Sequence, residues 1–272
     1  MNPVALKHVA VCIDAAAAWG GVFREALDWA SRLKLPLKIV GLPSGMASAP
    51  LQGAYAFNLD ECLTAGAECG VPCEVIECGH WSAVREQLFG SHGLSAFGAT
   101  LSVRVKTSFL RWSLRARNSA VLVCSVAGRP VSRMLIVHAP QESDRGFLAS
   151  ALSLCRLFEV IPVILTVART ERQARQVQRA AEEACYEHRL AAHLDYVAGV
   201  DARVAVASIA RWRRCSHVFL ERRQAIPWWR WLRGDTLHEL LGASDSLTFL
   251  ALPEAGLQVP VNDATREHLA TH

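Results

Sequence analysis

Short apolar segments alternate with amphipathic ones along the whole chain. In the first half, apolar runs at 8–13, 37–42, 72–77, 94–97 and 120–125 have the length of buried strands. Between them, apolar residues recur with helical spacing at 21–33, 59–69, 82–89 and 108–115. The segment 43–55 has the composition of a loop, and Asn58 with Glu61 predicts a capped helix start at 59. The pattern therefore predicts strands joined by helices.

The second half repeats this pattern. The apolar face that begins at Phe23 reappears at Phe147, an offset of about 124 residues. Strands are predicted at 133–138, 161–167, 192–197, 217–220 and 247–252. Helices are predicted at 144–158, at 170–188, where Thr170 and Gln173 form a capping box, and at 202–213, capped by Asp201. Alternating strands and helices predict an α/β fold with parallel sheets and helices on both faces.

The repeat also divides the chain. We expect a first domain at 1–127 and a second at 132–253, with a linker near Gly128 and Pro130. The remaining residues, 254–272, are polar and predict a loosely ordered tail.

One stretch near the C-terminus has the form of a binding site. In RGDTLHELLGASDSLTFLALP, residues 233–253, a glycine and the cap residue Asp235 open a short amphipathic helix that precedes a buried strand. A helix N-terminus that follows a strand attracts phosphate, because its free N–H groups and the helix dipole point there. The side chains at this position therefore decide whether the chain can bind a nucleotide.

These motifs resemble the universal stress protein family, in a tandem form. The family opens with an apolar strand ending in Asp, then small residues and a helix, as in VAVCID at 9–14 and REALDWA at 24–30. Its ATP-binding members carry G-x2-G-x9-G-[S/T] before the last helix. The end of this motif falls on Gly234 and Asp235 in the second half and on Thr107 and Ser108 in the first. The resemblance implies two adenine nucleotide α-hydrolase-like domains, each with a five-stranded parallel sheet, packed as a pseudo-dimer through their last strands.

In the second half, the residues that would surround phosphate in that family are replaced. The first two glycines of the motif fall on Glu221 and Gln224, whose side chains obstruct the approach of phosphate to the backbone. Asp235 can cap its helix, but its negative charge repels phosphate. The Asp that ends the opening strand is replaced by His138, which we interpret as a hydrogen-bonding residue.

The first half keeps more of the motif. Counting back from Thr107 places its glycines on Leu94 and Phe97, while Gly98 is one residue out of register. Asp14, Gly98 and Ser108 therefore form only a degenerate nucleotide site, and we expect neither ATP nor another cofactor. An ATP-binding switch that uses Asp14 and Ser108 is the alternative hypothesis.

Composition narrows the class of protein. Hydrophobic residues make up 51% of the 272 residues, enough for sizeable cores, and a net charge of +4 does not by itself indicate nucleic acid. The nine cysteines follow no secreted disulfide framework. The sequence has neither an apolar run near the roughly 18 residues that span a bilayer nor a signal peptide pattern. We therefore expect a cytoplasmic protein.

Two clusters have both a functional and a structural interpretation. The first cluster is a loop at 222–233 rich in Trp and Arg, with Arg222, Arg223, Trp228, Trp229, Arg230, Trp231 and Arg233. This loop can contact acidic lipid or single-stranded nucleic acid, or its Trp rings can simply cover a sheet edge. The second cluster consists of four cysteines, Cys62, Cys69, Cys73 and Cys78. It lacks the CxxC spacing of zinc sites, so we expect these cysteines to occupy core positions and not a metal site, with a reactive-thiol sensor as the alternative.

The pattern of residues predicts no catalytic centre. No Ser–His–Asp or Cys–His set can be placed in one site from the sequence. We therefore expect a non-catalytic tandem universal stress protein with a regulatory or scaffold role in the stress response. Its partners would be other proteins or a second copy of the chain, since exposed sheet edges favour pairing.

Overall fold

A computed structural model describes residues 3–13, 19–42, 52–90, 92–98, 108–109, 112, 119–125, 130–138, 144–200, 202–221, 247–253 and 256–259. The residues up to Ser125 are called the first half below, and those from Pro130 onward the second half.

The first half alternates strands and helices. Its strands are β1 (Val4–Ala5), β2 (His8–Ile13), β3 (Leu37–Gly41), β4 (Cys73–Glu77), β5 (Gly93–Gly98) and β6 (Ala120–Cys124). Its helices are α1 (Trp19–Leu33), α2 (Gln52–Glu68) and α3 (Trp81–Phe89), and Ser108, Phe109 and Trp112 are also helical.

The second half follows the same plan. Its strands are β7 (Met134–His138), β8 (Pro162–Ala168), β9 (His193–Ala198), β10 (His217–Glu221), β11 (Thr248–Leu252) and β12 (Leu257–Gln258). Its helices are α5 (Asp144–Leu157), α6 (Glu171–Glu187) and α7 (Ala202–Trp212). The helix predicted after Asp235 and the cap predicted at Asp201 lie outside the described residues.

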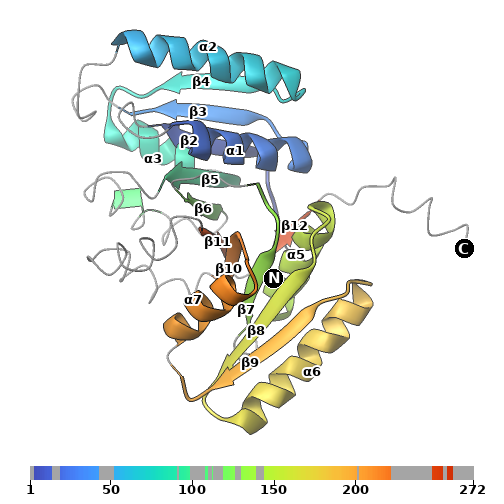
Figure 1. Ribbon diagram of the computed structural model, residues 1–272. Coiled ribbons are helices and arrows are strands. Elements are labelled where there is room, and N and C mark those ends of the chain that lie inside the picture. The colour runs from blue at the N-terminus through green and yellow to red at the C-terminus, as the bar shows by residue number, and fades with distance from the viewer. Residues whose placement is uncertain are drawn as a thin grey trace, which may run out of the picture.

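Within the described residues, the main sheet has ten strands in the order β4-β3-β2-β5-β6-β11-β10-β7-β8-β9 (Figure 1). Neighbouring strands are parallel except β6 and β11, which pair antiparallel with Phe249 opposite Val123. The order β4-β3-β2-β5-β6 therefore mirrors β9-β8-β7-β10-β11 across this pair. The sheet is continuous, and its two halves join through the last strand of each.

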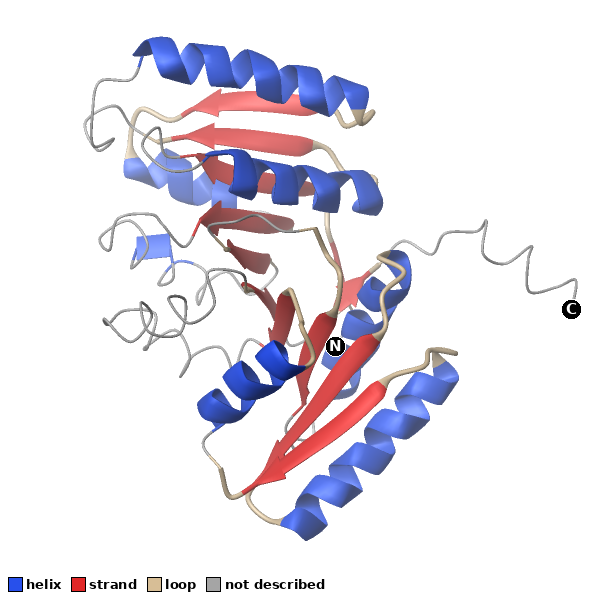
Figure 2. Ribbon diagram, in the orientation of Figure 1, coloured by secondary structure: helices blue, strands red, loops and turns tan. Residues whose placement is uncertain are grey.

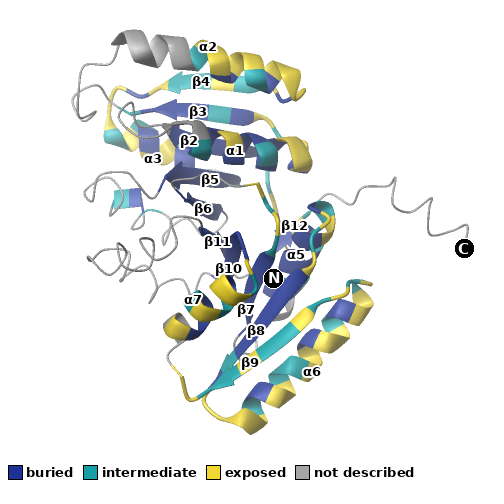
Figure 3. Cartoon of the chain, in the orientation of Figure 1, coloured by how far each residue is buried: buried dark blue, intermediate teal, exposed yellow. Residues whose placement is uncertain are grey.

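Helices cover both faces of this sheet (Figure 2). Successive residues of a strand point to opposite faces, so in β2 Val9 and Val11 pack on one face while Ala10 and Cys12 pack on the other. The first face is covered by α1, α2, α5 and α6, and the second by α3 and α7 together with Phe109 and Trp112. Strands β5, β6, β7 and β10 are buried at every position, whereas the edge strands β4 and β9 are partly exposed (Figure 3). Burial on both faces explains why the strands read as continuous apolar runs.

The helices bury the faces that the sequence predicts. The two predicted apolar faces are buried in α1 and at α5, namely Phe23, Ala26, Leu27, Ala30 and Leu33, and Phe147, Ala151, Leu152, Cys155 and Phe158. The cap of α6 is also confirmed, because Thr170 Oγ1 accepts a hydrogen bond from the Gln173 N–H at 3.3 Å.

Five of the described helices end in the same way. One residue shortly after each helix adopts a left-handed conformation, with φ of 54° at Lys34, 66° at Gly70, 55° at Glu159, 51° at Arg189 and 53° at Arg214. The next N–H then bonds to a carbonyl in the last turn, as Leu35 does to Ala30 at 2.9 Å. This turn directs the chain back to the sheet and places an apolar residue against it.

Two sequence predictions are wrong in this structure. Helix α2 begins at Gln52, so Asn58 lies inside the helix instead of capping it. The Ala, Tyr and Phe residues at 54–57 are compatible with a helix, and the loop composition of 43–55 comes mainly from its first eight residues.

The second wrong prediction concerns residues 256–259, the part of the predicted tail that the structure describes. Strand β12 pairs in parallel with β1, and Leu257 is buried with its N–H donating to Ser150 Oγ at 2.7 Å. Residues 256–259 are therefore ordered, and their apolar residue packs against α5. A two-residue strand is too short to give a periodic pattern.

None of the helices in the described part of the chain combines the length and hydropathy of a bilayer-spanning segment.

Candidate functional site

The topology defines one candidate ligand position in each half. The order of strands reverses between β2 and β5 in the first half and between β7 and β10 in the second. In open parallel sheets, ligands bind beyond the carboxyl ends of the strands at such a reversal. The side chains at the ends of these four strands therefore decide what the protein can bind.

Two of the three predicted first-half site residues lie in the described part of the chain. Gly98 is the last residue of β5 and is buried, and Ser108 is a half-buried helical residue. Asp14 follows the last residue of β2 but lies outside the described residues. The degenerate nucleotide site therefore stays a prediction.

Aromatic side chains anchor the segment that carries Ser108. The fully buried ring of Phe109 lies 5.3 Å from that of Phe97 in β5 and 5.9 Å from that of Phe89 in α3, both edge to face. Trp112 and Trp81 complete the cluster, with ring centroids 5.5 Å and 6.0 Å from Phe109. Aromatic pairs in this geometry add to the stability gained by burial alone.

The counted glycine positions of the first-half motif fall inside β5. Leu94 and Phe97, which occupy the glycine positions by counting, are strand residues with buried side chains on opposite faces of the sheet. In this structure β5 runs to Gly98, so neither position lies beyond the end of the strand.

Three buried polar side chains lie at the corresponding ends of the second-half strands. His138 ends β7 and pairs in register with Thr166 of β8, and Glu221 ends β10. Strand β10 pairs with β7 as far as Phe219 and Ile136, two residues before Glu221 and His138. Their exposed fractions are 5% for His138 and 0% for Thr166 and Glu221. The reversal point therefore holds an imidazole, a hydroxyl and a carboxyl group, where a phosphate-binding backbone would need space.

A second polar network joins the two halves near the other end of β10. Nε2 of His217 shares a hydrogen bond with Oε1 of Glu25 in α1 at 2.8 Å, and Nδ1 of the same ring lies 3.0 Å from Oγ of Ser216. The thiol of Cys124 in β6 lies against Glu25, and burial followed by this carboxylate raises its pKa well above the usual value.

The sequence alone could not place a Ser–His–acid set in one site, whereas the structure brings Ser216, His217 and Glu25 into contact. However, Ser216 Oγ accepts hydrogen bonds from the N–H groups of Ser132 at 3.0 Å and Arg133 at 3.4 Å. All three residues are at most 6% exposed. Such a hydroxyl fixes the backbone at the start of the second half, and it is not presented to a substrate.

This network could be suspected from the sequence in one respect. Glu25 lies three residues after Val22 and four before Trp29, so it belongs to the apolar face of α1. A carboxylate on a buried face needs a partner, but nothing in the sequence identifies His217 as that partner.

No protein-family model matches this sequence, and no curated protein matches it either. Solved structures do match. The cytoplasmic domain of a prokaryotic cation chloride cotransporter aligns with a TM-score of 0.61 at 12% identity, covering 93% of this chain and 98% of that chain. A universal stress protein from Archaeoglobus fulgidus DSM 4304 aligns with a TM-score of 0.61 at 14% identity, covering 91% and 97%. A universal stress protein from Pseudomonas aeruginosa UCBPP-PA14 gives 0.56 at 14% identity, covering 99% and 98%.

The chain has the universal stress protein fold. The alignments cover nearly the whole of each chain, so the likeness extends over both halves of the sheet. At these identities the similarity establishes the fold alone, and the role of the protein has to be argued from its own side chains.

Proposed function

We propose that this protein is a non-catalytic universal stress protein with a regulatory or scaffold role, which binds protein partners and does not bind ATP. The observation that carries the proposal is the carboxyl group of Glu221, fully buried at the end of β10, where the ATP-binding motif has a glycine. A carboxylate at this point repels phosphate, and its side chain fills the space that a glycine leaves open.

The first half supports the same proposal in a different way. Phe97 and Phe109 fill the face of the sheet beside the carboxyl end of β5. A nucleotide in this half would have to be held by residues after Gly98, with Asp14 and Ser108 as the polar groups. This arrangement is the ATP-switch alternative, and the experiment below separates it from the proposal.

The comparison with a transporter domain favours partner binding. The same fold occurs as the cytoplasmic domain of a prokaryotic cation chloride cotransporter. We infer a cytoplasmic location and a protein partner for this chain by analogy. The partly exposed edge strands β4 and β9 offer a second copy a place to pair, which light scattering of the purified protein would detect.

Equilibrium dialysis against ATP and Mg²⁺ tests the proposal. We expect no saturable binding to the wild-type chain, and no difference between the wild type and Asp14→Ala. Saturable binding by the wild type that Asp14→Ala abolishes would overturn the proposal in favour of the switch. The Trp- and Arg-rich loop at 222–233 lies outside the described residues, so the lipid or nucleic-acid alternative rests on its sequence alone.

A further inference from the structure

Three cysteines gather where α2 meets the edge strand β4. Cys73, the first residue of β4, places its Sγ in the space that a Cβ on Gly66 of α2 would occupy. The helix therefore has a notch at Gly66, and the Cys73 thiol sits in it. This close approach explains the glycine within the helix, because a side chain there would displace the thiol.

The notch has a cysteine on each side. Cys62 lies four residues before Gly66, and Cys69 lies three residues after it. The two cysteines therefore lie on the same side of the helix as Gly66. The N–H of Cys69 still bonds to the carbonyl of Ala65 at 3.1 Å, which keeps Cys69 in a helical position. Cys73 therefore has a thiol about one helical turn away in either direction.

The turn between the helix and the strand produces this arrangement. Gly70 has a φ of 66°, and the N–H of Val71 bonds back to the carbonyl of Gly66 at 2.9 Å. The chain thus reverses after Cys69 and returns alongside the last turn of α2. Cys78 lies on the opposite face of the sheet and is separate from the cluster.

The three thiols differ in access. Cys69 is exposed, Cys73 is half-buried and Cys62 is buried. Burial, and then the charge of Cys73, raises the pKa of Cys62 to about 12, and burial followed by Cys69 raises the pKa of Cys73. An oxidant from solvent therefore meets Cys69 first, because Cys73 and Cys62 are less accessible and the raised pKa of each favours the protonated thiol.

Oxidation is the chemistry that this cluster favours. The described residues contain no group of three or more His, Cys, Asp or Glu side chains arranged to hold a metal ion. An exposed thiol beside a second, half-buried thiol is the arrangement of a redox-sensitive pair with a resolving cysteine.

We propose that Cys69 and Cys73 form a reversible disulfide when the protein meets hydrogen peroxide. The Cys69 thiolate attacks one peroxide oxygen, the O–O bond breaks, and hydroxide leaves and is protonated to water, which gives a sulfenic acid on Cys69. The Cys73 thiolate then attacks the Cys69 sulfur, the S–O bond breaks, and a second hydroxide leaves and becomes water. Two thiols and one peroxide thus give one disulfide and two waters.

The disulfide would tie the end of α2 to the start of the edge strand β4. This inference is independent of nucleotide or partner binding at the strand ends, because the cysteines lie at the opposite end of β4 from its carboxyl terminus. Failure of one proposal therefore leaves the other intact.

The sequence allows a direct test by mass spectrometry. The purified full chain is treated with hydrogen peroxide, its remaining thiols are alkylated, and it is digested without reduction by a protease that cleaves after glutamate. Cleavage after Glu61, Glu68 and Glu74 separates the peptide 62–68, with Cys62, from the peptide 69–74, with Cys69 and Cys73. We expect peptide 69–74 to escape alkylation and to be lighter by two hydrogen atoms, and dithiothreitol to reverse this change.

Matched variants identify the two thiols. Cys62→Ser is expected to keep the light peptide, whereas Cys73→Ser is expected to lose it and to leave a Cys69 sulfenic acid that dimedone traps. Circular dichroism shows that each variant is folded. A cross-link between peptides 62–68 and 69–74 would overturn the proposal. So would alkylation of both cysteines in peptide 69–74 of the oxidised wild type.

Discussion

Glu25 and His217 form a buried hydrogen-bonded pair across the two halves of the molecule. They are 192 residues apart in sequence, their side chains are each 1% exposed, and Oε1 and Nε2 are 2.8 Å apart. Glu25 belongs to α1 of the first half and His217 to β10 of the second. The pair therefore links the halves on the face of the sheet that also carries α5.

Removing one partner of this pair should destabilise the whole protein. We expect Glu25→Ala and His217→Ala each to lower the free energy of unfolding by about 3–5 kcal/mol, because each leaves a buried polar group without its partner. The double variant should lose less than the sum of the two losses. Urea unfolding of the four proteins measures this coupling, and strictly additive losses would show that the pair is not energetically linked.

Trp29 fills the space between the halves. Its ring is 1% exposed and lies 4.5 Å from that of Phe158 and 6.4 Å from that of Phe219. Trp29→Ala should therefore lower the free energy of unfolding by about 3–5 kcal/mol, as for other buried aromatic truncations.

An exposed tryptophan provides the control for Trp29. Trp212 is 66% exposed and contacts Arg213 through a cation–π interaction at 4.0 Å. Trp212→Ala should cost roughly 1 kcal/mol or less. Equal losses for the two variants in denaturant unfolding would contradict the burial of Trp29 between the halves.

His8 should make the protein sensitive to mild acid. Burial, and next the positive charge of Lys38, lower its pKa from 6.5 to about 4. Between these two values the unfolded chain binds a proton that the folded chain does not, so stability is complete above about pH 6.5 and decreases as the pH falls toward 4. The loss is up to about 3 kcal/mol.

Substitution separates this effect from that of other histidines. His8→Gln should flatten the dependence of unfolding free energy on pH in this window, whereas the exposed His193→Gln should leave it unchanged. Denaturant titrations at pH 7, 6 and 5 measure both slopes. An unchanged slope in His8→Gln would show that another group is responsible.

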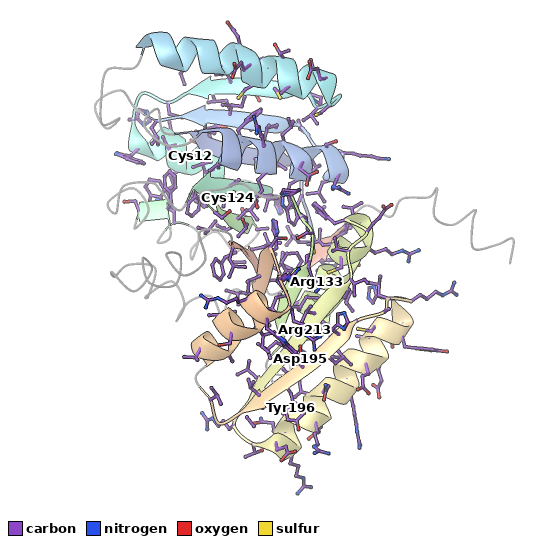
Figure 4. All side chains as sticks on the ribbon, viewed as in Figure 1. Cys12, Cys124, Arg133, Asp195, Tyr196 and Arg213 are labelled. Carbon is purple, nitrogen blue, oxygen red and sulfur yellow. The ribbon has the colours of Figure 1, made fainter. Side chains whose placement is uncertain are left out.

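Arg213 holds the edge strand β9 to the end of α7. Its guanidinium donates to both carboxylate oxygens of Asp195, at 2.8 Å and 2.9 Å, and its carbonyl accepts from Arg133 at 2.6 Å (Figure 4). Arg213→Lys should lower the free energy of unfolding by about 1 kcal/mol, because an ammonium group cannot reproduce the paired geometry. Arg175→Lys, which changes an exposed pair with Glu171, is the control and should have no measurable effect in thermal unfolding.

Much of this architecture could be predicted from the sequence. A strand buried on both faces is mostly apolar, so β6 appears as an uninterrupted run, β2 is apolar from Val9 to Ile13, and β2 spans the residues predicted for it. The apolar stripes of α1 and α5 identify their buried faces in the same way. Where the pattern is short, as in β12, or where loop and helix compositions overlap, as at the start of α2, the sequence was misleading.

The polar sites were harder to predict for a physical reason. Contacts such as Glu25 with His217 join residues that the folding of the sheet brings together, and their sequence spacing contains no signal. The position of His138 at the end of one strand and of Glu221 directly after another did follow from the motif alignment, because strand ends are fixed by the same apolar runs. That these side chains are buried together with Thr166 could be learned only from the structure.

The nucleotide content of the purified protein tests the central claim most directly. The chain is purified without added ligand, denatured, and the released small molecules are separated by chromatography and quantified against the protein. We predict adenine nucleotide far below one molecule per chain, because the strand ends hold Glu221 and His138 in one half and the other keeps only part of the motif. One adenine nucleotide per chain would contradict this account.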